Sequence, residues 1–226
     1  MNSTKTFSKE SETGRLLPLL TLSGPEQMAI DNLLLDNSVL QSKESPTLRF
    51  YQWKGIWLSI GRNQQHWPEH WSKLMKEKKV QFVRRPSGGE AVLHCGGLTY
   101  ALIWPSPPRK RREAYEKASE WLRKGFCQLG LELGFGDQPA NPRESNCFST
   151  CTSADLVDKN GCKRIGSAQL WRKGHLLQHG EIVLDPPETL WEEIFHSNSP
   201  KPAPPSIPRE GLEKSLIRAI KEYWPN

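Results

Sequence analysis

The sequence predicts one α/β domain in which helices and strands alternate along the chain and the strands form a mixed sheet. Its 226 residues are enough for a single domain with a sizeable core. Hydrophobic residues make up 36 % of the chain and nine residues are tryptophan, a composition typical of folded proteins. Segments of β-forming residues are interleaved with segments whose apolar residues recur every three or four positions. We expect a flexible leader over residues 1–20 and the folded domain over residues 21–226.

The N-terminal half is predicted to contain one helix followed by four strands. The helix starts at Ser23, because Ser23 and Glu26 have the spacing of a capping box and an apolar segment follows them. The first two strands are rich in β-formers and flank Lys54-Gly55, which predicts a tight turn between them. The four predicted strands cover residues 48–53, 57–60, 80–83 and 98–104.

The C-terminal half begins with the longest predicted helix, over residues 112–133, where one face is apolar and the other charged. Residues 136–153 have no period and are rich in Pro, Asn, Ser, Thr and Cys, which predicts a long loop. A strand pair follows, over residues 163–171 and 175–184, with its turn at Arg172-Lys173-Gly174. Two further helices are expected, over residues 187–195 and 209–223.

Charge and cysteine content limit the classes of partner and the compartment. The net charge of +6 favours acidic partners, namely nucleic acid, a membrane surface or an acidic carrier protein, and does not choose among them. No apolar run is long enough to span a membrane, and the polar N-terminus with its acidic residues is unlike a secretory or transit peptide. Five cysteines at irregular spacing do not fit a secreted disulfide framework. We therefore expect a cytoplasmic protein with free thiols.

The first segment that carries chemistry is Arg84-Arg85-Pro86-Ser87-Gly88-Gly89-Glu90-Ala91-Val92-Leu93-His94, directly after a predicted strand. Two glycines let backbone N–H groups approach an anion, and the two arginines before them can hold a phosphate or a phosphopantetheine thioester. Taken alone, the segment fits a glycine-rich turn with solvated arginines equally well.

The second segment is Gly161-Cys162-Lys163-Arg164-Ile165-Gly166-Ser167-Ala168-Gln169, and His179-Gly180 follows it. Small residues in a strand permit the close approach of a ligand, and a lysine directed into a cleft polarises a carbonyl group. An isolated strand lysine is more often simply exposed to solvent.

Together the two segments resemble the biotin/lipoate protein ligase superfamily, whose members share an R-R-x-S/T-G-G-x-A-V-x-H loop and a G-x-K-x-x-G-S-A strand followed by H-G. The resemblance extends to residues 25–31 and 48–53 and so covers nearly the whole chain after residue 20. It implies the mixed-sheet α/β fold that biotin ligases share with the core of class II aminoacyl-tRNA synthetases. It also implies substrate-binding roles, with no metal, for Arg84, Arg85, Ser87, Gly88, Gly89, His94, Gly166, Ser167, Ala168, His179 and Gly180.

Within the superfamily, the pair Cys147-Phe148 looks like the Cys-Phe of the LipM-type octanoyltransferases, which favours Cys147 over Cys151 as the nucleophile. ATP-dependent lipoate ligases usually add a small C-terminal domain, whereas 42 residues (226 minus 184) follow Leu184 here. The resemblance thus implies an acyltransferase that moves octanoyl from acyl carrier protein to a lysine of a lipoyl-carrier protein, such as glycine cleavage H protein or an E2 subunit.

The implied mechanism is a two-step exchange through a Cys147 thioester. A cysteine with a pKa of about 8.5 needs a nearby cation to become a thiolate at neutral pH, and Lys163 would supply that charge. The only prosthetic group involved would be the phosphopantetheine of the donor. ATP and Mg would be needed only by a ligase, and neither membrane nor nucleic acid is an expected partner.

Two departures from the family pattern lie in the glycine-rich loop. Glu90 stands where relatives usually have a glycine or a basic residue, and Cys95 where they usually have aspartate. Cys95 is also a rival thiol, although a small buried residue is the commoner role. These changes leave the acyl donor less certain than the nucleophile.

Several other functions remain open at this point. They are an ATP-dependent lipoate ligase, an amidotransferase between lipoyl-domain proteins, and a basic nucleic-acid-binding module that uses the run Arg109-Lys110-Arg111-Arg112. A zinc site that combines Cys147, Cys151 and Cys162 with His175 or His179 is a weak alternative, because the cysteine spacing is uneven.

Overall fold

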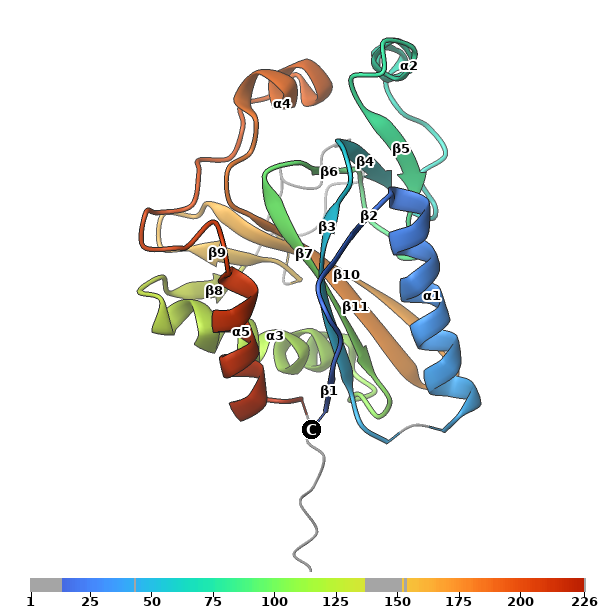
Figure 1. Cartoon of the computed structure of the whole chain (residues 1–226), viewed down its shortest axis with the longest axis vertical. Helices are drawn as coiled ribbons and strands as arrows, with labels where there is room; N and C mark the ends of the chain where they lie inside the picture. Colours follow the sequence, from blue (N-terminus) through green and yellow to red (C-terminus); the bar gives the residue numbers. More distant parts are fainter. Residues whose placement is uncertain (1–13, 43, 137–151, 153, 226) are drawn as a thin grey trace, which may run out of the picture.

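An eight-stranded mixed sheet forms the centre of the molecule (Figure 1). The computed structural model describes residues 14–42, 44–136, 152 and 154–225. The sheet has the order β1-β3-β7-β11-β10-β9-β8, with β2 also paired to β3, and only β1 and β2 run parallel to their neighbour. Its strands are β1 (Arg15–Leu16), β2 (Leu20–Leu22), β3 (Thr47–Trp53), β7 (Gly97–Trp104), β8 (Leu133–Phe135), β9 (Leu156–Asp158), β10 (Lys163–Arg172) and β11 (His175–Val183).

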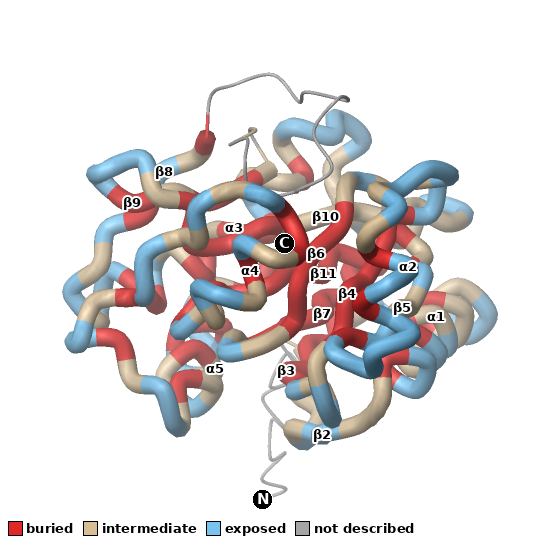
Figure 2. The backbone as a smooth tube through the Cα atoms, turned by 90° about the horizontal axis from the view of Figure 1, so that it is seen from above, coloured by how far each residue is buried: buried red, intermediate tan, exposed pale blue. Residues whose placement is uncertain are grey.

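Helices cover both faces of this sheet (Figure 1). α1 (Gly24–Leu40) lies on one face, while α3 (Arg111–Gln128) and α5 (Leu212–Glu222) lie on the other and pack against each other. Alternate side chains of the central strands point to opposite faces of the sheet. Phe50 and Tyr100 pack in the core on the α3 side, and Tyr51 and Ala101 pack in the core on the α1 side. The tube in Figure 2 shows these central strands as the buried part of the molecule. None of the helices in the described part of the chain is long and apolar enough to cross a membrane.

A second sheet of three strands has its own small core. It has the order β5-β4-β6 and consists of β4 (Trp57–Ile60), β5 (Gln81–Arg84) and β6 (Val92–His94). Trp71 of α2 (Glu69–Lys76) and Trp191 of α4 (Glu188–Phe195) pack against it. The strands predicted on either side of Lys54-Gly55 therefore exist but do not pair, since β3 already lies between β1, β2 and β7. Sequence analysis also missed α2, β1, β2, β6, β8 and β9.

The predicted helix over residues 112–133 ends earlier in the structure, at Gln128. Gly130 adopts a left-handed backbone angle of φ 78°, which glycine tolerates and which stops a helix. Leu133, which we assigned to the helix, instead begins β8.

The hairpin of β10 and β11 confirms the predicted strand pair and its turn. Lys173 and Gly174 both have positive φ angles, 48° and 86°, as a two-residue hairpin turn requires. The register pairs Ala168 with His179 and Ile165 with Ile182, and it is interrupted between Lys163 and Ile165 where β10 meets β9. The hairpin thus brings the second motif and the His-Gly pair onto neighbouring strands.

Candidate active site

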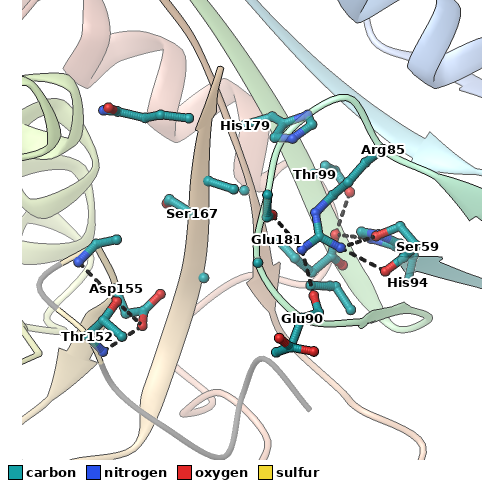
Figure 3. A pocket seen from close by; sticks show the side chains of 18 of the residues that line it. Ser59, Arg85, Glu90, His94, Thr99, Thr152, Asp155, Ser167, His179 and Glu181 are labelled. Carbon is teal, nitrogen blue, oxygen red and sulfur yellow. Dashed lines mark hydrogen bonds and ion pairs between the residues drawn. The ribbon is translucent and has the colours of Figure 1, made fainter. Parts of the chain in front are cut away.

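The two motifs meet at one cavity of about 430 Å³. Its wall is built by β10, β11, the glycine-rich loop after β5 and the first turn of α3, with Met28 of α1 and Trp53 of β3. Most of the predicted site residues line it: Arg85, Gly88, Gly89, His94, Lys163, Gly166, Ser167, Ala168, His179 and Gly180. Figure 3 shows Asp155 and Thr152 on one side of the strand that carries Ser167, and Arg85, His94 and Glu181 on the other side.

Lys163, at the start of β10, forms a buried ion pair with Asp155. The distance from its Nζ to Oδ2 of Asp155 is 2.9 Å, and the side chains are 3 % and 4 % exposed. The same carboxylate oxygen accepts hydrogen bonds from the backbone N–H (2.8 Å) and the hydroxyl (3.0 Å) of Thr152 (Figure 3). A cation and a carboxylate are therefore fixed in the cavity wall. Lys163 is buried, unlike the solvent-exposed lysine that is more common in a strand.

Cys147 lies outside the described residues, as does Cys151. Thr152, five positions after Cys147, lines the cavity. The role of Cys147 as the nucleophile stays a prediction.

The glycine-rich loop is held by the two arginines that precede it. Arg85 is buried and donates to the carbonyls of Ser59 (2.8 Å), Gly88 (2.8 Å) and Glu90 (2.6 Å). Arg84 lies outside the cavity wall and donates to backbone carbonyls of the loop that follows β4. Both guanidinium groups donate to backbone carbonyls and so hold the loop in place, and their predicted role of holding a phosphate stays a prediction.

The amide N–H groups of Gly88 and Gly89 have no hydrogen-bond acceptor within the described ranges. Gly89 has a φ of 89°, and a Cβ atom at Gly88 would meet nothing within 4 Å, so the loop leaves open space beside these donors. Successive free amides of this kind suit an oxygen that carries negative charge.

Ser87 and His179 belong to a buried hydrogen-bonded chain that ends on Asp31. Nδ1 of His179 lies 2.9 Å from Oδ2 of Asp31, and its Nε2 contacts the Ser87 hydroxyl. Because Asp31 is also ion-paired with Arg49, its carboxylate favours a proton on Nδ1, and Nε2 then accepts from Ser87. Burial and the neighbouring Asp31 raise the pKa of Tyr51 well above its ordinary value, so this phenol stays protonated and donates to Asp31 (3.1 Å).

A second buried chain joins Ser59, His94 and Glu181 (Figure 3). Nε2 of His94 lies 2.8 Å from the Ser59 hydroxyl and Nδ1 lies 2.8 Å from Oε2 of Glu181, which also accepts from Thr99. The His94 ring stacks on Trp53 with 3.9 Å between the ring centroids. Burial lowers the pKa of His94 and outweighs the opposing effect of Glu181, so the ring is neutral at pH 7.

Ser167 and Gly180 lie side by side on the hairpin and contact Tyr100. The Ser167 hydroxyl lies 2.8 Å from the Tyr100 hydroxyl, and burial raises the pKa of Tyr100 to about 12. A Cβ atom at Gly180 would lie 2.6 Å from the carbonyl oxygen of Gly166. Gly180 is thus needed for strand packing, whatever its contact with substrate.

Glu90 and Cys95, the two departures from the family pattern, are both partly buried. Burial raises the pKa of Glu90, although Arg85 opposes this. Burial, and next the charge of Glu181, raise the pKa of Cys95, which makes its thiol a poorer nucleophile at neutral pH than an ordinary cysteine. Cys95, Cys127 and Cys162 are free thiols, and no group of metal-ligating residues occurs in the described part of the chain.

Sequence analysis missed the acidic members of the site. Asp31 lies in the segment 25–31 that carries the resemblance, and Glu181 directly follows His179-Gly180. Both residues could therefore have been named as candidates from the sequence, because they lie in or beside the recognised segments. Asp155 follows Thr152 by three positions, a spacing that signals a local side chain to backbone hydrogen bond but not a partner for Lys163.

One known protein family matches nearly the whole chain. The family model of the lipoyl protein ligase A/B catalytic domain matches residues 23–224. The chain belongs to this family.

Among similar family members is the octanoyltransferase LipM of Geobacillus kaustophilus, which is 39 % identical over 207 residues, or 86 % of this chain and 70 % of the relative. LipM of Bacillus subtilis is 36 % identical over 82 % of this chain and 70 % of its own length, and LipM of Halalkalibacterium halodurans 38 % over 75 % and 65 %. The chain thus spans about two thirds of the length of these relatives.

Solved structures of lipoate ligases share the fold of this family member. A lipoate-protein ligase A bound with ATP superposes with a TM-score of 0.71 at 21 % identity, covering 93 % of this chain and 85 % of that one. A bipartite lipoate protein ligase of Thermoplasma acidophilum has a TM-score of 0.67 at 20 % identity, over 93 % and 83 %. The predicted superfamily and its mixed-sheet α/β fold are confirmed.

Proposed function

We propose that this chain is an octanoyltransferase of lipoate biosynthesis, which moves octanoyl from acyl carrier protein to a lysine of a lipoyl-domain protein through a thioester on Cys147. The relatives named octanoyltransferase, at 36 to 39 % identity over most of the chain, support octanoyl transfer and an acyltransferase. The cysteine, the donor, the acceptor protein and a cytoplasmic location are the parts that we add.

The buried Lys163–Asp155 pair is the observation that carries the mechanism. It fixes a cation in the wall of a cavity that Thr152, five positions after Cys147 in the sequence, also lines. A fixed ammonium group stabilises a thiolate and the oxyanion formed from a thioester carbonyl. The free amides of Gly88 and Gly89 provide two further donors for that oxyanion.

The two steps balance without a further reactant. In the first, the Cys147 sulfur attacks the octanoyl carbonyl, a C–S bond forms to Cys147, the C–S bond to the carrier breaks, and the Cys147 proton leaves with the carrier thiol. In the second, the neutral amine of the acceptor lysine attacks the new thioester, an amide bond forms, the C–S bond to Cys147 breaks, and one amine proton goes to the released Cys147 sulfur. Neither step needs ATP or a metal.

Intact mass spectrometry after incubation with octanoyl-carrier and without acceptor tests this proposal. We expect a mass gain of one octanoyl group on the wild type and on Cys95→Ala, and none on Cys147→Ala. Subsequent addition of a lipoyl domain should move the octanoyl group to that domain without ATP or Mg. Transfer that requires ATP and survives Cys147→Ala would identify a ligase, whereas loading only from an octanoylated lipoyl domain would identify an amidotransferase.

A further inference from the structure

Three exposed cations, Arg109, Lys110 and Arg111, form a basic ridge where the chain enters α3. Arg111 lines the cavity, and so does Tyr115 one turn later on the same helix face. The Tyr115 side chain lies against β10 near Gln169, which also lines the cavity. The ridge therefore borders the cavity.

The ridge differs from the cations around it in its ion pairing within the described residues. Neither Arg109, Lys110 nor Arg111 forms an ion pair with any residue that the structure describes, whereas the next cation, Arg112, pairs with Glu116 at 2.9 Å. Cations at the start of a helix also oppose the helix dipole, which favours acidic residues there. The ridge therefore does not help α3 to form, and its exposed charges are available to bind a partner.

The cavity runs from the ridge to Lys163 along β10. Gly166, Ser167, Ala168 and Gln169 line it in succession, with Gln169 beside Tyr115 and Lys163 at the other end. The ridge is exposed at the border of the cavity whereas Lys163 is buried in its wall, so a molecule that rests on the ridge needs an arm that enters the cavity to present a thioester at Lys163. Phosphopantetheine is an arm of this kind, and proteins that carry it on an acidic surface complement the charge of the ridge.

We infer that the basic ridge of Arg109, Lys110 and Arg111 is the docking surface for an acidic acyl-carrier protein. The inference rests on the proposed function and adds where its donor binds. Exposed charges of opposite sign guide association and weaken with salt, so the ridge acts on the affinity for the carrier rather than on the chemical step.

The test compares Arg109→Gln/Lys110→Gln with the matched pair Lys214→Gln/Arg218→Gln, which removes two exposed cations from α5, outside the cavity lining. Calorimetric titration measures the Kd for the carrier protein whose phosphopantetheine bears no octanoyl group and so cannot acylate the enzyme, and turnover is measured with octanoyl-carrier protein and with a small octanoyl thioester of pantetheine. We expect the ridge variant to raise the Kd and the KM for the carrier about tenfold, with less dependence on salt. Its kcat and its kinetics with the small thioester should not change, and the α5 variant should behave as the wild type.

Equal effects of the two variants on the Kd would overturn the inference, as would a loss of activity toward the small thioester equal to that toward the carrier. A ridge variant that loses salt-dependent affinity for duplex DNA or RNA, while its Kd for the carrier is unchanged, would make the ridge a nucleic-acid surface instead. Because the Kd is measured without turnover, a wild type that binds the carrier through the ridge but transfers no octanoyl group would contradict the proposed function alone.

Discussion

Lys163 and Asp155 are two opposite charges that have almost no contact with water. Taking a charge out of water costs several kcal/mol, which the partner and its hydrogen bonds offset only while both members are present. The pair therefore contributes no more to stability than well-packed apolar residues of similar size would. Its place in the cavity wall supports the role that we propose for Lys163, which is to stabilise the negative charge that develops in acyl transfer.

Asp155→Asn should separate these two roles. The variant leaves the Lys163 ammonium buried without a carboxylate, so we expect the free energy of unfolding to fall by about 3 to 5 kcal/mol and kcat by roughly 10² or more. Adding Lys163→Met removes the unpaired charge and should restore most of the stability but none of the activity. Urea unfolding and steady-state transfer measure the two effects, and recovery of activity in the double variant would contradict a catalytic role for Lys163.

His94 gives a pH dependence of stability with a defined sign. Burial lowers its pKa below the ordinary 6.5, so between the folded and unfolded pKa values the unfolded chain binds a proton that the folded chain does not. The contribution is complete above pH 6.5 and is lost as pH falls through the folded pKa. We expect the free energy of unfolding in urea to decrease from pH 7 to pH 5, with a shallower slope in His94→Gln. Equal slopes in the two proteins would mean that His94 does not contribute.

Single site residues are predictable from the sequence where they belong to a motif of neighbouring residues. They are not predictable where their partner is distant in the sequence. Gly88, Lys163 and His179 were found because their neighbours in the chain form motifs. Asp155 and Asp31 are partners of Lys163 and His179 only after β10 and β11 have paired and α1 has packed on them. The contacts of Arg84 and Arg85 with backbone carbonyls likewise depend on β4 lying beside β5.

Among the elements, the hairpin of β10 and β11 joins the second motif to the core. Its turn residues and alternating pattern are local, and for that reason the sequence predicted it well. The pairing of β3 and β4 was wrong because the two strands belong to different sheets, and the choice of neighbour depends on β7 and β6, which come some forty residues later. The early end of α3 depended on one glycine in a left-handed conformation.

Gly180→Ala tests the closeness of the hairpin to β7. The new Cβ atom would lie 2.6 Å from the Gly166 carbonyl oxygen and 2.8 Å from Tyr100 Cε1, and the strand register prevents the backbone from moving away. We expect a loss of about 1 to 3 kcal/mol in the free energy of unfolding, together with weaker transfer because Ser167 is displaced. Gly134→Ala in exposed β8, where nothing lies within 4 Å, is the control and should change neither quantity. A stable and fully active Gly180→Ala variant would show that the strands can separate without harm.

For the whole molecule, the first and last described residues meet at the β1 edge of the sheet, away from the hairpin of β10 and β11. β1 pairs with β3, and the backbone N–H of Arg15 donates to Pro46 at 2.8 Å. The Trp224 ring covers Gly14 so closely that a Cβ atom there would lie 2.5 Å from it. The first and last described residues thus close the α3 side of the core, while the residues that line the cavity come from the middle of the chain.

Trp224→Ala should therefore reduce stability without changing catalysis. The Trp224 side chain is only 7 % exposed and belongs to the core cluster under α3 and α5, so its removal leaves a cavity that we expect to cost about 3 to 5 kcal/mol. Trp67→Ala, which truncates a tryptophan that is 39 % exposed, is the matched control and should cost much less. Urea unfolding gives the stabilities, and transfer is assayed well below the Tm of each variant. Because Trp224 is outside the cavity lining, kcat and KM should equal those of the wild type. A fall in kcat at a temperature where Trp224→Ala is fully folded would instead show that closure of the chain ends governs the geometry around Lys163.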